Sequence, residues 1–566
     1  MGLKRAQSVL TVAALAIATM LGALLSPTGT PPPSPPARPT TPALDAAATP
    51  HATPAVAAGE LSPAILPDQR VAVAETTGAL PRYVIDATLE PPAGDGDLAT
   101  IAGTIELRYI NTTGNRIDSL PFRLYPNLRQ YDTGRMRVGD IAVDGRAVTP
   151  RAPALHAVLA STPVATPAVI GAALILILVP LPEALAPGAA TTVSMSFTTT
   201  VPSDPPDASG RFRYEPDRDA WALSGWYPML AGFDPRSGWN LDPPAAWSDV
   251  TFGEAALYDV TLDASEDLAI VTPGVEADSD DSGGRRRFAS GPAREFALYA
   301  APALQETQAE AANGTTVVVH HPVESEAGAR QVLAWATDAL ETFDAMYGNY
   351  PYAVLDIVAV PGVTGLEFSG MIWIDAAFVA DPAGSGSRPG AIEFLVAHEV
   401  AHQWWYGLVG SDPQRHAWLD EGLAEYSAVL YFEQVHGPDA AQMQIGQGLT
   451  LPYATMLVTS GDQIVDQPAS AFPDDATYFA TTYRKAALGF EAMHQEIGHD
   501  AFFAALRDYA ETHRFGIATP QDLLDAFARS SDADVGGLWH LWFETASGQV
   551  RIVMEPEAGT TPPPAG

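Results

Sequence analysis

The sequence of 566 residues contains no cysteine, which excludes disulfide bonds, thiolate metal sites and cysteine nucleophiles. Basic residues are also scarce. Lysine occurs only at Lys4 and Lys485, and 30 Lys and Arg face 67 Asp and Glu, for a formal net charge of −37. Such a chain lacks the basic face that neutralises phosphates, so we expect no nucleic-acid partner. Strong negative charge favours cationic ligands and opposes self-association, which predicts a monomer.

The N-terminal segment has the pattern of an export signal. Lys4 and Arg5 precede an apolar run from Val9 to Leu25, which approaches the ~18–20 residues that span a bilayer. We predict a signal peptide or membrane anchor over residues 1–26 and a disordered Pro/Ala/Thr-rich stalk over residues 27–70. A similar composition predicts a disordered tail over residues 555–566. The protein is therefore expected outside the cytoplasm, either secreted or tethered to a membrane by its N-terminal segment.

Residues 71–304 predict an antiparallel, β-rich N-terminal domain. Short alternating or apolar runs are separated there by Gly, Pro, Asn and Asp, as in Ile101–Ile110, Thr192–Phe197, Ala256–Leu262 and Leu268–Thr272. The run Ala173–Val179 is strongly apolar, but it is too short to span a bilayer and is followed by Pro180 and Pro182. We predict a buried strand for this run.

Residues 305–554 predict a mainly helical α/β domain, because apolar residues recur there at helical spacing. Tyr352–Val360 is predicted to form a strand. The expected helices are Ala327–Tyr347, Ala391–Leu408, Ala417–Val435, Tyr483–Ile497, Asp500–Thr512 and Pro520–Ala528.

The segment His398-Glu399-Val400-Ala401-His402 places two histidines four residues apart. On a helix they lie on one face, so both imidazoles can bind one ion. A second predicted helix returns after a Gly-Ser-Asp-Pro turn and can bring Glu421 beside them. Two nitrogens and one carboxylate leave the fourth position of a Zn²⁺ ion to water, as in catalytic sites. Glu399 could then take a proton from that water, whose pKa the metal lowers towards ~7.

A simpler interpretation is that two surface histidines share one helix. The apolar residues on several sides of this helix, including Phe394, Val396 and Trp404, argue against it. A helix of this kind is buried, so its polar residues need partners.

These motifs resemble the membrane alanyl aminopeptidase family of gluzincins, which includes the leukotriene hydrolases. The resemblance rests on the run from His398 to Trp405, on Trp418-Leu419-Asp420-Glu421-Gly422, and on the eighteen residues between the second His and the third ligand. It implies a thermolysin-like catalytic domain that binds one Zn²⁺ per chain through His398, His402 and Glu421. Leu223 to Pro228 similarly resembles part of the family's N-terminal β domain.

The resemblance also implies roles outside the metal ligands. Tyr483-Arg484-Lys485-Ala486-Ala487 is similar to the family's Tyr-x-Lys-Gly-Ala motif, which implies that Tyr483 stabilises the oxyanion. Tyr478 is the reserve candidate for this role. Glu367 stands where the family places the glutamate that binds the substrate's α-amine, although its neighbours differ from the family's Gly-x-Met-Glu-Asn. For a second amine-binding acid, Glu215 is the candidate.

We therefore predict a zinc metallopeptidase that acts on peptides and releases N-terminal residues. A zinc endopeptidase remains an alternative, because the amine-binding motif is altered and the family's large C-terminal helical domain is not recognised. A catalytically inactive scaffold on the same fold is the other alternative, although intact His398, Glu399, His402, Glu421 and Tyr483 argue against it. For Glu425, one turn after Glu421, contact with the amine, orientation of a ligand and a solvated position all remain open.

Overall fold

A computed structural model of the chain describes residues 64–94, 96–131, 133–152, 175–203, 210–245, 247–277, 284–384 and 390–547. The predicted export segment 1–26, most of the stalk 27–70 and the tail 555–566 lie outside these residues. The described end of that stalk segment packs against the fold, since Ile65 is buried and forms a β-bridge with Tyr352. None of the described helices is long and apolar enough to cross a membrane.

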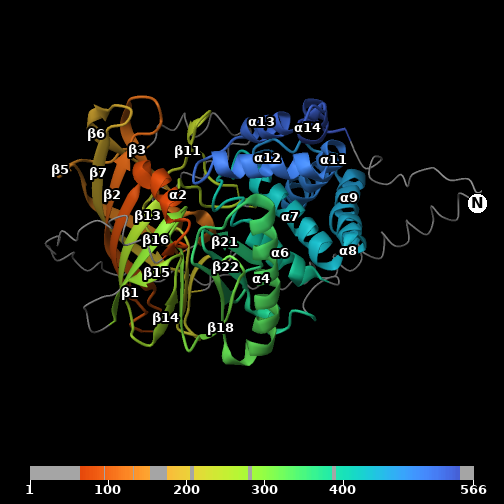
Figure 1. Cartoon of the computed structure of the whole chain (residues 1–566). Helices are drawn as coiled ribbons and strands as arrows, with labels where there is room; N and C mark the ends of the chain where they lie inside the picture. The colour runs from red at the N-terminus through yellow and green to blue at the C-terminus, as the bar shows by residue number, and fades with distance from the viewer. Residues whose placement is uncertain are drawn as a thin grey trace, which may run out of the picture. The chain divides into compact units, whose positions relative to one another are not determined.

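The N-terminal region consists of β-sheets, as predicted (Figure 1). Its largest sheet has eight strands in the order β15-β16-β13-β1-β2-β7-β4-β5. Neighbouring strands are antiparallel except β1 and β13, which run parallel. In sheet order the strands are β15 (Val275–Ala277), β16 (Arg285–Ala293), β13 (Ala256–Asp263), β1 (Arg82–Glu90), β2 (Ala99–Ile110), β7 (Ala190–Val201), β4 (Arg135–Val143) and β5 (Arg146–Ala147). The short helix α2 (Arg70–Thr76) precedes them.

Smaller sheets complete this region. One has the order β10-β3-β6, one the order β14-β17-β9-β8, and β11 pairs with β12. Their bounds are β10 (Met229–Leu230), β3 (Ile117–Arg123), β6 (Leu176–Leu185), β14 (Leu268–Val271), β17 (Leu298–Pro302), β9 (Ala220–Leu223), β8 (Phe212–Glu215), β11 (Phe233–Asp234) and β12 (Gly238–Trp239).

The part of the apolar run from Leu176 to Val179 belongs to β6, whose partner is β3, while Ala173 and Leu174 lie outside the described residues. The strand continues through both prolines to Leu185, instead of ending before them. Proline lacks the N–H that a central strand needs, but β6 is the edge strand of its sheet. The edge position therefore explains why the prolines do not end the strand.

A mixed five-stranded sheet begins the second region, in the order β18-β19-β20-β22-β21. The strands β19, β20 and β22 are mutually parallel, and β18 and β21 are antiparallel edges. Helix α4 (Glu326–Tyr347) packs on this sheet (Figure 1). The strand bounds are β18 (Gln305–Glu310), β19 (Thr316–His321), β20 (Val354–Val360), β22 (Met371–Asp375) and β21 (Gly365–Phe368).

The remainder of this region is helical, which confirms the predicted mainly helical α/β part. Helix α6 contacts both α4 and α7. The α-helices are α5 (Ala376–Ala380), α6 (Ala391–Ala401), α7 (Trp418–His436), α8 (Pro438–Met443), α9 (Leu451–Thr459), α10 (Asp475–Phe479), α11 (Ala486–Ile497), α12 (His499–Thr512), α13 (Pro520–Ser530) and α14 (Val535–Phe543). Two π-helices, η6 (Gln444–Thr450) and η8 (Ala480–Lys485), continue into α9 and α11.

Two large apolar cores support these layers. One lies among the sheets of the N-terminal region, and the other joins the five-stranded sheet to the helices. A smaller cluster connects the regions, because Tyr299 of β17 packs against Trp373 of β22. The two regions are thus joined by apolar packing among the described residues.

Candidate functional site

Three side chains from α6 and α7 point their ligand atoms at one centre. His398 Nε2 lies 3.1 Å from His402 Nε2 and 3.2 Å from Glu421 Oε2, and His402 Nε2 lies 3.3 Å from the same carboxylate oxygen. Three vertices of a tetrahedron around zinc, with bonds of ~2.0–2.1 Å, lie roughly 3.3 Å apart. All three residues are buried. The spacing and the donor types therefore fit a zinc ion.

The second ring nitrogens support this fit. His402 Nδ1 lies 2.9 Å from the carbonyl oxygen of Trp405, so Nδ1 carries the hydrogen and donates it. The Nε2 lone pair of the neutral ring then faces the centre. Lone pairs and a carboxylate at these distances repel one another unless a cation lies between them. This chain therefore builds a site that a metal ion, or protons in its place, must neutralise.

The charges of the site agree with that requirement. Burial opposes ionisation of Glu421, yet the hydrogen bonds from His398 and His402, which form when protons on their Nε2 atoms take the place of a metal ion, outweigh it and lower the pKa of Glu421. Burial disfavours the charged form of His402, but Glu367 and Glu421 together raise its pKa well above the usual value. The side chains around the ligand atoms thus stabilise positive charge between them.

Glu399 lies beside the ligand atoms with one oxygen free. Its Oε2 is buried and has no hydrogen-bond partner among the described residues. Burial raises the pKa of Glu399 to about 7, against the opposing fields of His398 and His402. A carboxylate with a free oxygen and a pKa near neutrality is suited to accept and return a proton.

Strand β21 holds Glu367 near this acid. Glu399, His402 and Glu367 each offer an atom within 4.8 Å of the others. Gly365 of the same strand approaches so closely that a Cβ atom there would lie 2.0 Å from Glu399 Oε1. Burial, followed by the charge of Asp249, raises the pKa of Glu367 well above its usual value. Glu367 and Glu399 therefore form an acidic cluster next to the ligand atoms.

Tyr483 contacts the ligand set from the π-helix η8. Its hydroxyl donates to Glu421 Oε1, and its ring stacks at 5.8 Å from the ring of His398. Tyr478 is buried in a cluster with Phe472 instead, with its ring 6.2 Å from Tyr483. The structure thus brings the hydroxyl of Tyr483 to the ligand set.

Glu215 has other partners. Its carboxylate binds Arg213 at 2.7 Å and Arg218 at 2.8 Å, which neutralises it. The sequence predicts no role for Asp249. Besides burial, its negative charge helps to raise the pKa values of Glu367, Glu399 and Tyr483. Asp249 itself lies 3.5 Å from Arg211. No motif marks Asp249 because it comes from an irregular segment before β13.

Helix α6 ends earlier than the sequence predicts, at Ala401 instead of Leu408. Beyond this end the backbone leaves helical geometry, and Tyr406 has a φ of 146°. The side chain of Gln403 follows this end and binds a distant part of the chain. Its Oε1 accepts a hydrogen bond from Gly370 N at 2.8 Å, and its Nε2 donates to the carbonyl of Phe368 at 3.0 Å. These bonds connect the end of the histidine-bearing helix to the β21–β22 turn, and so to the strand that carries Glu367.

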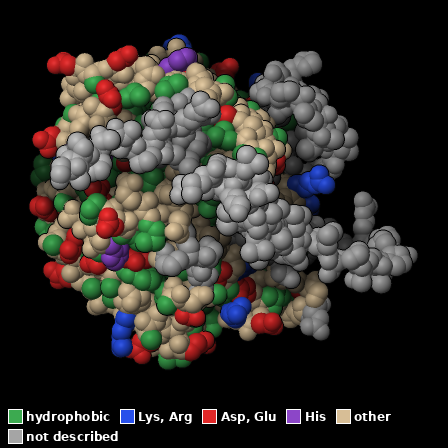
Figure 2. Space-filling model, turned by 90° about the vertical axis from the view of Figure 1, so that its right-hand side faces the viewer, with side chains coloured by type: hydrophobic (Ala, Val, Ile, Leu, Met, Phe, Trp, Pro, Cys, Tyr) green, Lys and Arg blue, Asp and Glu red, His purple; other side chains and the backbone are tan. Residues whose placement is uncertain are grey.

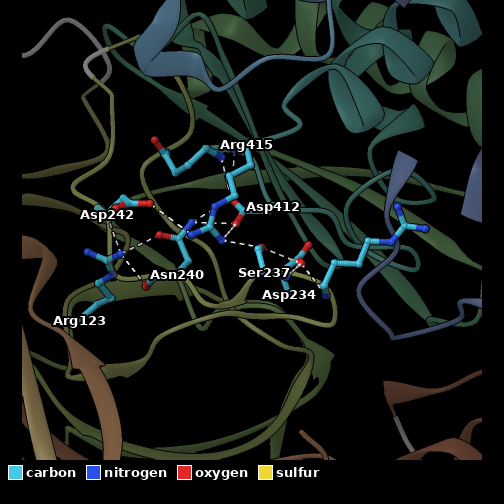
Figure 3. A network of polar contacts seen from close by, with 9 residues as sticks. Arg123, Asp234, Ser237, Asn240, Asp242, Asp412 and Arg415 are labelled. Carbon is cyan, nitrogen blue, oxygen red and sulfur yellow. Dashed lines mark hydrogen bonds and ion pairs between the residues drawn. The ribbon is translucent and has the colours of Figure 1, made fainter. Parts of the chain in front are cut away.

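A polar network holds the loop between α6 and α7 against the β region (Figure 3). Asp412 accepts two hydrogen bonds of 2.9 Å from the amide of Asn240 and one of 3.0 Å from Arg415. Arg123 donates to both the carbonyl and the side-chain oxygen of Asn240, at 2.7 and 2.9 Å. This loop joins the histidines to Glu421, so the network supports the geometry of the ligand set.

Comparison with known proteins points to one class of enzyme. Residues 332–542 match the model of the Peptidase family M1 domain. Aminopeptidase M1-A of Oryza sativa subsp. japonica is 25% identical over 336 residues, which are 57% of this chain and 38% of the relative. Aminopeptidase 2 of Candida albicans is 27% identical over 215 residues, which are 37% of this chain and 23% of the relative.

The chain thus covers less than half the length of these relatives. Among solved structures, the M1 zinc metallopeptidase of Deinococcus radiodurans has the same two-region fold. It superposes with a TM-score of 0.57 at 17% sequence identity, over 85% of this chain and 95% of that one.

Proposed function

We propose that this chain is a zinc-dependent peptidase that removes residues from the N-termini of peptides. The observation that carries the proposal is the set of three ligand atoms 3.1–3.3 Å apart, beside a buried carboxylate with a free oxygen. His398, His402 and Glu421 would hold the metal. A zinc ion at this position supplies a Lewis acid and acidifies water.

The residues around the ligand set have separate roles in the proposed reaction. Glu399 takes a proton from the attacking water and passes it to the departing amine. The hydroxyl of Tyr483, which now donates to Glu421, turns to donate to the oxyanion that develops on the scissile carbonyl. Burial of the site excludes bulk water, which strengthens both interactions.

The acidic cluster of Glu367 and Glu399 supports cleavage at the N-terminus of the peptide substrate. Glu367 and Glu399 lie together, and the negative charge of Asp249 is felt by both carboxyl groups. Such a group of carboxylates binds an ammonium ion well. β21 is an edge strand, so an extended peptide can pair with it and place its first residue at Glu367. The relatives named above are called aminopeptidases, and a mutant of the Deinococcus enzyme has been solved with a Tyr-Ser-Ala substrate.

Export and a monomeric state are part of this proposal. The basic residues and apolar run of segment 1–26 support an extracytoplasmic protein that the N-terminal segment either tethers or releases. Figure 2 shows many Asp and Glu and few Lys and Arg over the face that lies on the right in Figure 1. Together with the net charge of −37, this supports a monomer.

The test is a digestion of mixed peptides, free and N-acetylated, by the zinc-loaded full chain and by Glu399→Gln. We expect stepwise loss of N-terminal residues from the free peptides only, and no products from Glu399→Gln. Internal cuts in both kinds of peptide would show an endopeptidase and remove Glu367 from its role. An absence of products with the zinc-loaded wild type would favour the scaffold.

A further inference from the structure

Glu425 is a buried acid outside the ligand set. It lies on α7, one turn after Glu421, and its side chain is 3% exposed. Its Oε2 lies 3.2 Å from Nδ1 of His398, the ring nitrogen that faces away from the ligand centre. The contact is not a straight hydrogen bond, and Nδ1 has no hydrogen-bond partner among the described residues. Among the described residues, Glu425 is therefore the acid placed to satisfy this nitrogen.

Arg484 supplies the opposite charge. Its Nη1 forms an ion pair with the second oxygen of Glu425. Arg484 belongs to η8, directly after Tyr483, and its guanidinium carbon lies 5.8 Å from the centre of the Tyr483 ring. A buried carboxylate is costly unless it is paired. Arg484 therefore stabilises Glu425 in its position against His398.

The two histidines of the site have different supports. The Nδ1 of His402 faces a backbone carbonyl, which the fold fixes whatever the neighbouring side chains are. The Nδ1 of His398 faces a side-chain carboxylate, which can rotate away. A carboxylate behind an imidazole holds its hydrogen on the outer nitrogen, orients the ring and makes the inner nitrogen a better ligand. The support of His398 thus depends on two side chains.

We propose that Glu425 and Arg484 form a charged pair that positions His398 and sets the affinity of the protein for zinc. Both are positioning residues, since neither supplies an atom to the ligand set. The inference rests on the proposed metal centre and adds two residues to it.

The experiment titrates metal-free full-length protein with Zn²⁺ alone, in competition with a chromophoric chelator of known affinity. The variants are Glu425→Gln, Arg484→Gln, Arg484→Lys and the double variant of the two Gln substitutions. The matched control is Arg287→Gln in the β region. There a 24% exposed Arg pairs with a 2% exposed Asp259, which is close to the 30% and 3% of Arg484 and Glu425.

We expect Glu425→Gln to weaken zinc binding by ~10–100-fold, the range for the loss of a ligand's supporting partner. Arg484→Gln should weaken it by about tenfold, since the carboxylate remains but loses its anchor. Arg484→Lys keeps the charge and should restore most of the affinity. The double variant should bind zinc as Glu425→Gln does, because Arg484 acts through Glu425. Arg287→Gln should bind zinc as the wild type does.

A merely structural pair would behave differently. It would lower the unfolding temperature of the metal-free variants and leave the zinc affinity of the folded fraction unchanged. Zinc affinities of Glu425→Gln and Arg484→Gln within threefold of the wild type would therefore overturn the inference. Additive losses in the double variant would overturn the role of Arg484. A wild-type chain that binds no zinc would instead refute the proposed metal centre itself.

Discussion

The most informative single residue is Tyr483, because its hydroxyl already donates to a ligand oxygen of Glu421. Because the hydroxyl hydrogen of Tyr483 is already shared with Glu421, it can be donated to a developing oxyanion only after the hydroxyl leaves Glu421. In the proposed mechanism Tyr483 therefore has a resting partner, Glu421, and a catalytic partner, the oxyanion. Burial and the charge of Glu421 raise its pKa well above the usual value, which keeps the hydroxyl protonated as a donor.

Tyr483→Phe should lower kcat for peptide hydrolysis by ~10²–10³-fold, the cost of one oxyanion donor. Zinc content should stay at the wild-type level, because the tyrosine is not among the three ligands. Steady-state kinetics and metal analysis on the same samples check both expectations. Tyr478→Phe is the control and should keep kcat within a few-fold. Equal losses in both variants would mean that ring packing, and not the hydroxyl of Tyr483, matters.

A second prediction for a single residue concerns Gly365. A Cβ atom there would lie 2.0 Å from Glu399 Oε1, so Gly365→Ala must displace the proposed base or the strand. We expect at least a tenfold loss of kcat/KM, and a loss of about 1–3 kcal/mol in stability from overpacking. Gly446→Ala is the control, because a Cβ there meets nothing within 4 Å. Full activity of Gly365→Ala would contradict this close approach.

At the scale of elements, the site depends on how α6 ends. The sequence predicts a helix from Ala391 to Leu408, because apolar residues continue at helical spacing. The structure ends the α-helix at Ala401, and the side chain of Gln403 then binds the backbone of the β21–β22 turn. A tertiary contact of this kind overrides local periodicity and cannot be read from it.

Gln403→Ala should leave the N–H of Gly370 and the carbonyl of Phe368 without their partner. We expect a loss of about 2 kcal/mol in stability and a higher KM for free peptides, since Glu367 loses its support. Urea unfolding and steady-state kinetics measure the two effects. The exposed Gln495→Ala is the control. An unchanged KM would show that the turn keeps its position without Gln403.

The sequence predicts the elements that carry the chemistry better than the contacts between them. The four-residue spacing of His398 and His402 is a local property of the sequence. The approach of their two imidazoles to one centre could therefore be predicted from it. The positions of Asp249 and Arg484 could not, because each depends on how a distant segment packs against the site. The continuation of β6 through Pro180 could not be predicted from the sequence either, since an edge position is a property of the whole sheet.

At the scale of the whole molecule, the β region and the helical region share one buried polar network. Asn240 and Arg123 come from the β region, and Asp412 comes from the loop between the two ligand-bearing helices (Figure 3). The side chain of Asp412 is fully buried. Its charge must therefore be satisfied across this boundary, and the β region helps to hold the loop between α6 and α7.

Asn240→Ala removes two of the hydrogen bonds to Asp412, so the loop should open more often. A cost of about 2 kcal/mol corresponds to roughly 30-fold faster amide exchange in peptides that cover residues 407–417. Hydrogen–deuterium exchange with mass spectrometry measures this directly. The exposed Asn115→Ala should leave exchange of the loop unchanged. Unaltered protection of the loop in Asn240→Ala would contradict the supporting role of the network.

The central claim is that His398, His402 and Glu421 bind one zinc ion. Its most direct test is diffraction from zinc-loaded crystals of the full chain, at energies just above and below the zinc absorption edge. We predict one strong anomalous peak per chain, ~2.0–2.2 Å from the two Nε2 atoms and from a carboxylate oxygen of Glu421. No peak at these three atoms, or the strongest peak elsewhere, would contradict the account.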